Sequence, residues 1–209
     1  AIDHEEYRRG RKKTHILYGE AVGILAGDAL LNYAFETAAG AFSCGEEPQR
    51  IAGAMQILSK KAGIYGMIVG QVVDVLNENN PAVDGEMLEF IYRLKTGALI
   101  EAAMMIGAVL AGADAQEVSV LEQAAGKVGV AFQIQDDILD VTSTLEELGK
   151  PVGSDEKNQK VTYVTLYGLK EAKYQVEKLT KEAADGMSSL SVKNEFLYHL
   201  LLDLIQRSC

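Results

Sequence analysis

Long apolar stretches with helical spacing run through this chain of 209 residues and restrict it to helical folds. Apolar side chains recur every three or four residues, and no segment shows the apolar–polar alternation that marks a half-buried strand. Only three prolines interrupt the sequence, and its many Ala, Leu, Glu and Lys residues favour helices. We therefore predict an all-α, multi-helix bundle without strands. The expected helices cover residues 19–41, 48–76, 86–110, 115–141, 161–166, 169–187 and 193–207.

Composition limits the class of protein. The chain is 48% hydrophobic and 24% charged, which fits one globular domain. Its formal net charge of −10 argues against non-specific binding to nucleic acid. No run of about 18 uncharged apolar residues is present, so we predict no membrane span. Cys44 and Cys209 lie far apart and indicate free thiols in a reducing compartment, so we expect a cytoplasmic protein.

The segment FQIQDDILD, at residues 132–140, places three aspartates inside an apolar run near the end of an expected helix. Asp136 and Asp140 share one face of that helix, and Asp137 flanks them. At an effective dielectric constant near 20, two carboxylates about 4 Å apart repel by roughly 4 kcal/mol. A cation is therefore expected beside them. Oxygen ligands suit Mg²⁺, which proteins usually hold with one or two carboxylates and substrate phosphates.

Cationic residues occur in three further motifs. Asp3 precedes the segment RRG at residues 8–10, and arginine side chains bind phosphate oxygens in a bidentate manner. The segment KTG at residues 95–97 stands within an expected helix, where the lysine can point into the interior or extend to solvent. The segment GKPVGSD at residues 149–155 is glycine-rich but lacks the full phosphate-loop pattern. Taken together with the aspartates, these motifs predict a site for magnesium and diphosphate.

The motifs stand in the order found in trans-isoprenyl diphosphate synthases of the polyprenyl synthetase family, and the chain resembles the bacterial farnesyl and geranylgeranyl diphosphate synthases of that family. The resemblance implies the isoprenoid-synthase fold, a helical bundle around a central apolar cavity. It also implies that residues 1–209 form a single domain lacking the family's N-terminal helices and first Asp-Asp pair. We therefore expect the native chain to begin before Ala1. The matching segments are residues 3, 8–10, 19–21, 25–30, 95–97, 132–140, 149–150, 153–155 and 160.

The same resemblance implies a function. It implies a magnesium-dependent prenyltransferase that condenses isopentenyl diphosphate with an allylic diphosphate, with farnesyl diphosphate as the expected product, and that acts as a homodimer. Arg8 would contact the allylic diphosphate and Arg9 the isopentenyl diphosphate. The implied metal ligands are Asp3, Asp136, Asp137, Asp140 and Asp155. The other implied substrate-binding residues are Lys95, Thr96, Gln133, Lys150 and Lys160, and the implied catalytic residues are Lys95, Asp136 and Lys150.

Several alternatives stay open at this point. One is a geranylgeranyl diphosphate synthase, because product length depends on positions that this chain does not contain. Another is a catalytically silent regulatory subunit of a prenyl synthase, although the chain keeps the aspartate motif that such a subunit would lose. A terpene cyclase fits less well, because the arginine pair and the Lys-Thr pair suit a second diphosphate substrate. A di-iron bundle enzyme would need Glu-x-x-His pairs, which are absent from the sequence.

Overall fold

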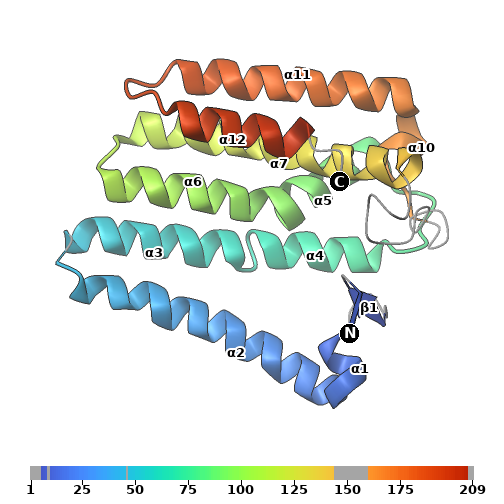
Figure 1. The fold of residues 1–209 in the computed structure, drawn as a ribbon, viewed down its shortest axis with the longest axis horizontal. Helices are drawn as coiled ribbons and strands as arrows, with labels where there is room; N and C mark the ends of the chain where they lie inside the picture. Colours follow the sequence, from blue (N-terminus) through green and yellow to red (C-terminus); the bar gives the residue numbers. More distant parts are fainter. Residues whose placement is uncertain (1–5, 9, 46, 144–159, 207–209) are drawn as a thin grey trace.

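The computed structural model describes residues 6–8, 10–45, 47–143 and 160–206, and these residues are almost entirely helical (Figure 1). The all-α prediction is therefore confirmed. The helices are α1 (Thr14–Tyr18), α2 (Glu20–Ala39), η1 (Gly40–Ser43), α3 (Pro48–Ala62), α4 (Met67–Leu76), α5 (Gly85–Tyr92), η2 (Arg93–Gly97), α6 (Ala98–Ala111), α7 (Ala115–Thr142), α10 (Tyr163–Tyr167), α11 (Leu169–Ser188) and α12 (Glu195–Gln206). Most of the segment between the expected helices at 115–141 and 161–166 lies outside the described residues.

One small hairpin corrects the prediction that the chain has no strand. Strands β1 (Tyr7–Arg8) and β2 (Arg11–Lys12) pair antiparallel, with Tyr7 opposite Lys12 and Arg8 opposite Arg11. Gly10 in the turn has a φ of 72°, in the left-handed region that glycine adopts without steric cost. A ladder of two residues per strand is too short to produce an alternating pattern, so the sequence carries no signal for it.

The expected helix at 48–76 is divided into α3 and α4 by a break at residues 63–66. A side chain at Gly66 would place its Cβ 2.6 Å from the carbonyl carbon of Lys61, and one at Gly63 would lie 2.5 Å from the carbonyl oxygen of Ser59. Because backbone atoms occupy that space, only glycine fits at either position. Apolar periodicity continues across the break, so the sequence pattern alone predicts one uninterrupted helix.

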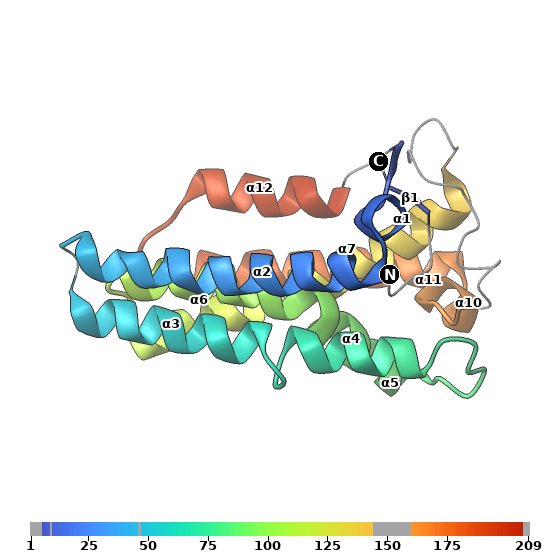
Figure 2. The same ribbon diagram turned by 90° about the horizontal axis from the view of Figure 1, so that it is seen from below.

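The long helices lie side by side, with α7 at the centre of the molecule. Helix α7 packs against α6 on one flank and α11 on the other, and α6 packs in turn against α3 (Figure 1). Helix α12 covers part of α7 and α11 on one side of this row (Figure 2). The buried core follows α7, where Ala125, Val128 and Ile134 are almost completely enclosed. Among the described helices of ten or more residues, α2 is the one that buries none of its side chains.

The N-terminus of α7 is capped by the side chain of Asp114. The Asp114 carboxylate accepts hydrogen bonds from the backbone N–H groups of Gln116 and Glu117, at 2.8 and 2.9 Å. The Glu117 side chain in turn accepts from the Asp114 backbone N–H, which completes a capping box. These bonds satisfy donors that would otherwise have no partner in the first turn. The cap therefore fixes the start of the helix that carries the aspartate motif.

Among the described residues, the continuous helical stretch Gly85–Ala111 has the length and mean hydropathy of a membrane-crossing helix. The stretch carries Lys95 and Glu101, so it is not an uncharged apolar run, yet its most apolar 18-residue window is hydrophobic on average. Length and composition alone are weak evidence for a membrane span, since an apolar helix in the core of a bundle has the same properties. Glu101 is buried in this stretch against Lys61 of α3.

Candidate active site

A cavity of about 900 Å³ lies between the N-terminal segment and the pair formed by α4 and η2. Basic groups line one part of it: Arg11, Lys12 and Lys13 come from β2 and the start of α1, and Lys95 comes from η2 together with Thr96. Apolar and small residues, Gly23, Ile24, Gly27 and Met67, line another part. The cavity therefore combines a cationic region, suited to an anion, with a region that can contact a hydrocarbon group.

The residues of the predicted Lys-Thr-Gly motif form a π-helical turn, η2, between α5 and α6. Such turns are rare and often occur at functional sites. Two glycines of neighbouring helices allow the backbone to approach this turn. A Cβ at Gly70 of α4 would lie 2.7 Å from the carbonyl carbon of Leu94, and a Cβ at Gly129 of α7 would come closer than 3.0 Å to the Cα of Gly97. Backbone contact on both sides therefore holds Lys95 and its neighbour in place.

Asp74 of α4 is the functional residue that sequence reasoning missed. It is only 6% exposed, and its carboxylate contacts two of the predicted substrate-binding lysines. The Nζ atom of Lys95 lies 2.5 Å from Oδ2, and that of Lys160 lies 3.0 Å from Oδ1 and 3.3 Å from Oδ2. Burial alone would raise the pKa of Asp74, but Lys160 and Lys95 together hold this pKa below its usual range. In the sequence, the signal for Asp74 is that it is a single aspartate within an apolar helix.

Thr96 and Gln133 meet across the contact between η2 and α7. The Thr96 hydroxyl donates to the Gln133 side-chain oxygen at 3.0 Å. Gln133 therefore lies beside the Lys-Thr motif. Asp136 follows Gln133 by three residues on α7, so the two side chains share a face of that helix, and Asp136 is half-buried. The tertiary structure therefore places the start of the aspartate motif next to the cationic motif.

Asp137 occupies a different environment from Asp136. It is 4% exposed, and its Oδ2 atom accepts hydrogen bonds from the Tyr92 hydroxyl at 2.5 Å and from the Tyr163 backbone N–H at 2.8 Å. These bonds connect α7 to α5 and to the start of α10. Asp137 therefore joins three helices, whatever else it binds. Asp140 is also buried, at 1% exposure.

The remaining predicted residues are only partly covered by the structure. Arg8 pairs through its backbone in β1. Asp3, Arg9, Lys150 and Asp155 lie outside the described residues. Within the described part of the chain, no group of three or more acidic, His or Cys side chains is arranged to hold a metal ion. The magnesium-binding role of Asp136, Asp137 and Asp140 therefore stays a prediction.

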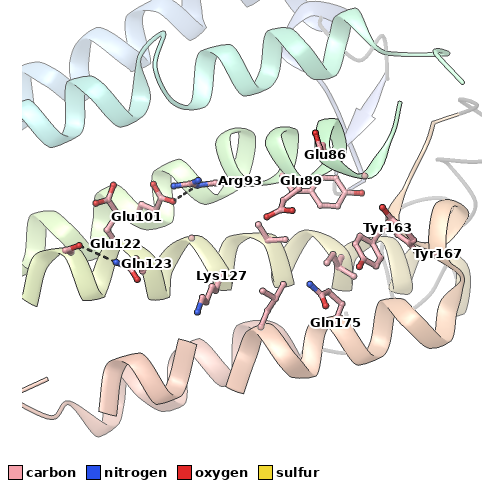
Figure 3. A pocket seen from close by; sticks show the side chains of 17 residues that line it. Glu86, Glu89, Arg93, Glu101, Glu122, Gln123, Lys127, Tyr163, Tyr167 and Gln175 are labelled. Atoms are coloured by element: carbon pink, nitrogen blue, oxygen red, sulfur yellow. Dashed lines mark hydrogen bonds and ion pairs between the residues drawn. The ribbon is translucent and has the colours of Figure 1, made fainter. Parts of the chain in front are cut away.

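A second hollow of about 550 Å³ lies between α5, α7 and α11, and it contains none of the predicted site residues (Figure 3). Its lining mixes charged, tyrosine and amide side chains. At one end, Glu101 is 2% exposed and lies 3.7 Å from the Nε atom of Arg93. Lys61 pairs with Glu101 and also with Glu122, at 2.6 Å from the latter. These charges neutralise one another, so the hollow is distinct from the basic cavity.

The geometry defines a class of protein: an all-helical bundle in which a lysine-bearing turn packs against a helix with an aspartate motif. The model of the polyprenyl synthetase family matches residues 1–199. The chain therefore belongs to the polyprenyl synthetase family.

Two relatives illustrate the similarity. The chain is 44% identical over 193 residues to a dimethylallyltranstransferase of Fischerella ambigua (strain UTEX 1903), which covers 92% of this chain and 56% of the relative. It is also 44% identical over 204 residues to the chloroplastic geranylgeranyl pyrophosphate synthase of Capsicum annuum, covering 98% of this chain and 55% of the relative. The chain thus spans about half the length of these curated relatives.

Solved structures agree with the fold. The geranyltransferase of Helicobacter pylori, complexed with magnesium and isoprenyl diphosphate, aligns with a TM-score of 0.80 at 34% identity, over 96% of this chain and 64% of the other. The geranylgeranyl pyrophosphate synthetase of Pyrococcus horikoshii aligns with a TM-score of 0.88 at 27% identity, over 99% of this chain and 73% of the other. Both similarities extend over nearly the whole chain, which confirms the isoprenoid-synthase type of bundle.

Proposed function

We propose that the protein containing this chain is a magnesium-dependent trans-prenyltransferase that joins isopentenyl diphosphate to an allylic diphosphate. The observation that carries the proposal is the grouping of Lys95, Lys160, Thr96 and Gln133 around the η2 turn, close to the aspartate motif. These are residues that the family resemblance implies to be substrate-binding. They come from three separate segments of the chain, η2, α7 and the stretch before α10, and the fold brings them together.

The reaction requires the carbon–oxygen bond of the allylic diphosphate to ionise. Negative charge grows on the departing diphosphate, so preorganised cationic donors stabilise the transition state more than the ground state. Lys95 provides such a donor at the cavity, and Arg11, Lys12 and Lys13 add positive charge around it. The Thr96 hydroxyl, held by Gln133, adds a further polar group beside Lys95.

The donor chemistry of α7 fits a magnesium ion. Asp136 presents a half-buried carboxylate on the same helical face as Gln133, and Mg²⁺ prefers carboxylate and phosphate oxygens. When bound there, magnesium would supply Lewis-acid stabilisation of the departing diphosphate. We assign Asp136 as the first magnesium ligand and Asp140, one helical turn later on α7, as the second. Asp3 and Asp155 complete the proposed set from outside the described residues.

The carbon–carbon bond-forming step requires that the two substrates are held in position and that water is excluded. The allylic cation is attacked by the double bond of isopentenyl diphosphate, and holding both partners in one cavity makes this step effectively intramolecular. Water would quench the cation, so the apolar part of the cavity at Ile24 and Met67 serves to exclude it. A proton then leaves the new product, and the released diphosphate is the proposed acceptor.

We propose geranylgeranyl diphosphate as the product, in place of the farnesyl diphosphate favoured by the sequence analysis. The support comes from the names of the relatives, since proteins from Capsicum annuum and Cyanophora paradoxa at 44% and 42% identity are geranylgeranyl diphosphate synthases.

We further propose a homodimer in a reducing compartment such as the cytoplasm. Helix α2 supports the first part, because its apolar residues, including Leu25, Leu30 and Tyr33, are exposed along its length. Contiguous apolar surface of this kind marks interaction sites. The exposed free thiol of Cys44 supports the second part.

The test incubates the complete gene product with isopentenyl and dimethylallyl diphosphates and Mg²⁺, and measures product chain length. We expect a twenty-carbon diphosphate, loss of turnover in EDTA, and loss of turnover in Lys95→Gln, which keeps the helical circular dichroism of the wild type. A protein that makes no prenyl product alone, but raises the output of an added synthase, would instead be a regulatory subunit. A fifteen-carbon product would restore the farnesyl assignment.

A further inference from the structure

We propose that Asp74 is a positioning residue for the prenyl transfer reaction: it holds the ammonium groups of Lys95 and Lys160 together so that both bind one diphosphate. This inference rests on the proposed function and extends it to a residue that neither the family resemblance nor the family model assigned. Asp74 does not itself bind substrate in this account. It acts through the two lysines.

The geometry of the carboxylate supports this role. Its two oxygens share two lysines, which come from positions 21 and 86 residues further along the chain. Asp74 is 6% exposed, whereas the side chains of Lys95 and Lys160 are 30% and 32% exposed. The buried member of the cluster is therefore the anion, and the cations lie towards solvent, where an anionic ligand can reach them.

Charge explains why the lysines need this partner. Two ammonium groups that contact one carboxylate lie close together and would repel each other without it. With Asp74 ionised, the cluster carries a net charge of about +1, which still attracts diphosphate. Each lysine also has three N–H donors, so contact with Asp74 leaves donors for phosphate oxygens. The carboxylate therefore organises the lysines without cancelling their charge.

The position of Asp74 links this cluster to the rest of the site. It stands on α4, one turn after Gly70, whose missing side chain allows α4 to contact η2 at Leu94. The helix that supplies the carboxylate is thus the same helix that supports the π-helical turn. Lys160 precedes Thr162, the N-cap of α10, so Asp74 also connects α4 to the segment entering α10.

The experiment measures binding of inorganic diphosphate with Mg²⁺ to the complete gene product by calorimetry, together with kcat and KM for the allylic diphosphate. Asp74→Asn keeps the shape and removes the charge. We expect its Kd for diphosphate and its KM to rise roughly 10- to 100-fold, because two charge-assisted hydrogen bonds lose their geometry. Asp74→Glu keeps the charge and should fall between wild type and Asp74→Asn. Asp185→Asn, which removes an exposed charge on α11, serves as the matched control and should bind like the wild type.

A double-mutant comparison separates positioning from general damage. In the background Lys95→Gln/Lys160→Gln, Asp74→Asn should cause no further loss of diphosphate binding, since there is nothing left to position. An additional loss there of the size seen in the wild-type background would overturn the proposal. So would a folded Asp74→Asn protein that binds diphosphate as tightly as the wild type or more tightly, because Asp74 would then only compete with the ligand.

A failure of the Asp74 proposal can be distinguished from a failure of the proposed function. Diphosphate binding does not require turnover, so a wild-type protein that binds diphosphate but makes no prenyl product would refute the function while the Asp74 result still stands. If Asp74→Asn does not fold, the Kd of Asp74→Glu for diphosphate tests the positioning role instead. Moving the carboxylate by one methylene should weaken binding about threefold or more, and an unchanged Kd in that variant would refute the role of Asp74.

Discussion

Replacing Gly129 by Ala tests whether backbone packing holds the η2 turn in place. The new Cβ would lie 3.1 Å from the backbone N of Gly97 and closer still to its Cα, well inside ordinary van der Waals contact. Both neighbours are backbone atoms of packed helices, so neither side can relieve the overlap by turning a side chain away. The variant therefore forces α7 and η2 apart by about 1 Å if ordinary van der Waals contact is to be restored.

The expected cost follows from this overlap. Overpacking a tight contact by one methyl group costs about 1–3 kcal/mol of unfolding free energy. Helix propensity offsets up to about 1 kcal/mol of this, because Ala is a better helix former than Gly. For a chain of this length each kcal/mol shifts the Tm by roughly 2–4 °C. We expect Gly129→Ala to lower the Tm by several degrees and to weaken diphosphate binding, since Lys95 and Thr96 move with the turn.

The matched control is Gly107→Ala on α6. Its Cβ would meet no atom within 4 Å, so only the propensity gain of about 0.5–1 kcal/mol remains. The same chemical change should thus raise stability at one glycine and lower it at the other. Urea unfolding of both variants, with diphosphate binding measured in parallel, provides the comparison. Equal effects at the two positions would refute the assigned role of close backbone contact between α7 and η2.

Three further outcomes are expected. Lys61→Met should lower the unfolding free energy by about 3 kcal/mol in urea denaturation, because Glu101 keeps its buried charge without its main partner, whereas Lys127→Met, at an exposed ion pair, should change stability little. Burial lowers the pKa of Lys61, but hydrogen bonds to its carboxylate partners outweigh the effect of burial, so the pKa is raised overall. The difference in unfolding free energy between wild type and Lys61→Met should therefore persist up to about pH 10. It should shrink as the pH rises through the raised pKa of Lys61. Tyr92→Phe should cost about 1–3 kcal/mol, because Asp137 loses a buried donor, and an unchanged midpoint would argue against a structural part for that carboxylate.

Much of the helical framework could be predicted from the sequence because its signal is local. Apolar periodicity placed the start of α7 at its observed residue and its end within one residue of the observed end. The same periodicity could not detect the break between α3 and α4, where apolar spacing continues although Gly63 and Gly66 leave the helical conformation. Whether two backbones approach closely at a glycine depends on which residues pack opposite that glycine. A single sequence does not contain that information.

The candidate site also combines features that the sequence indicates with features that only the packing of the helices creates. The family resemblance selected Lys95, Thr96 and Gln133, whose cationic and polar side chains are of the types that can bind a diphosphate. Only the tertiary structure brought Asp74 to Lys95 and Lys160, and only it gave Asp137 partners on two other helices. Ion pairs and buried hydrogen bonds form between groups that packing makes adjacent, whatever their separation in the chain. The sequence alone therefore indicated most of the helices and the types of side chain at the candidate site, and packing decided which carboxylate supports which cation.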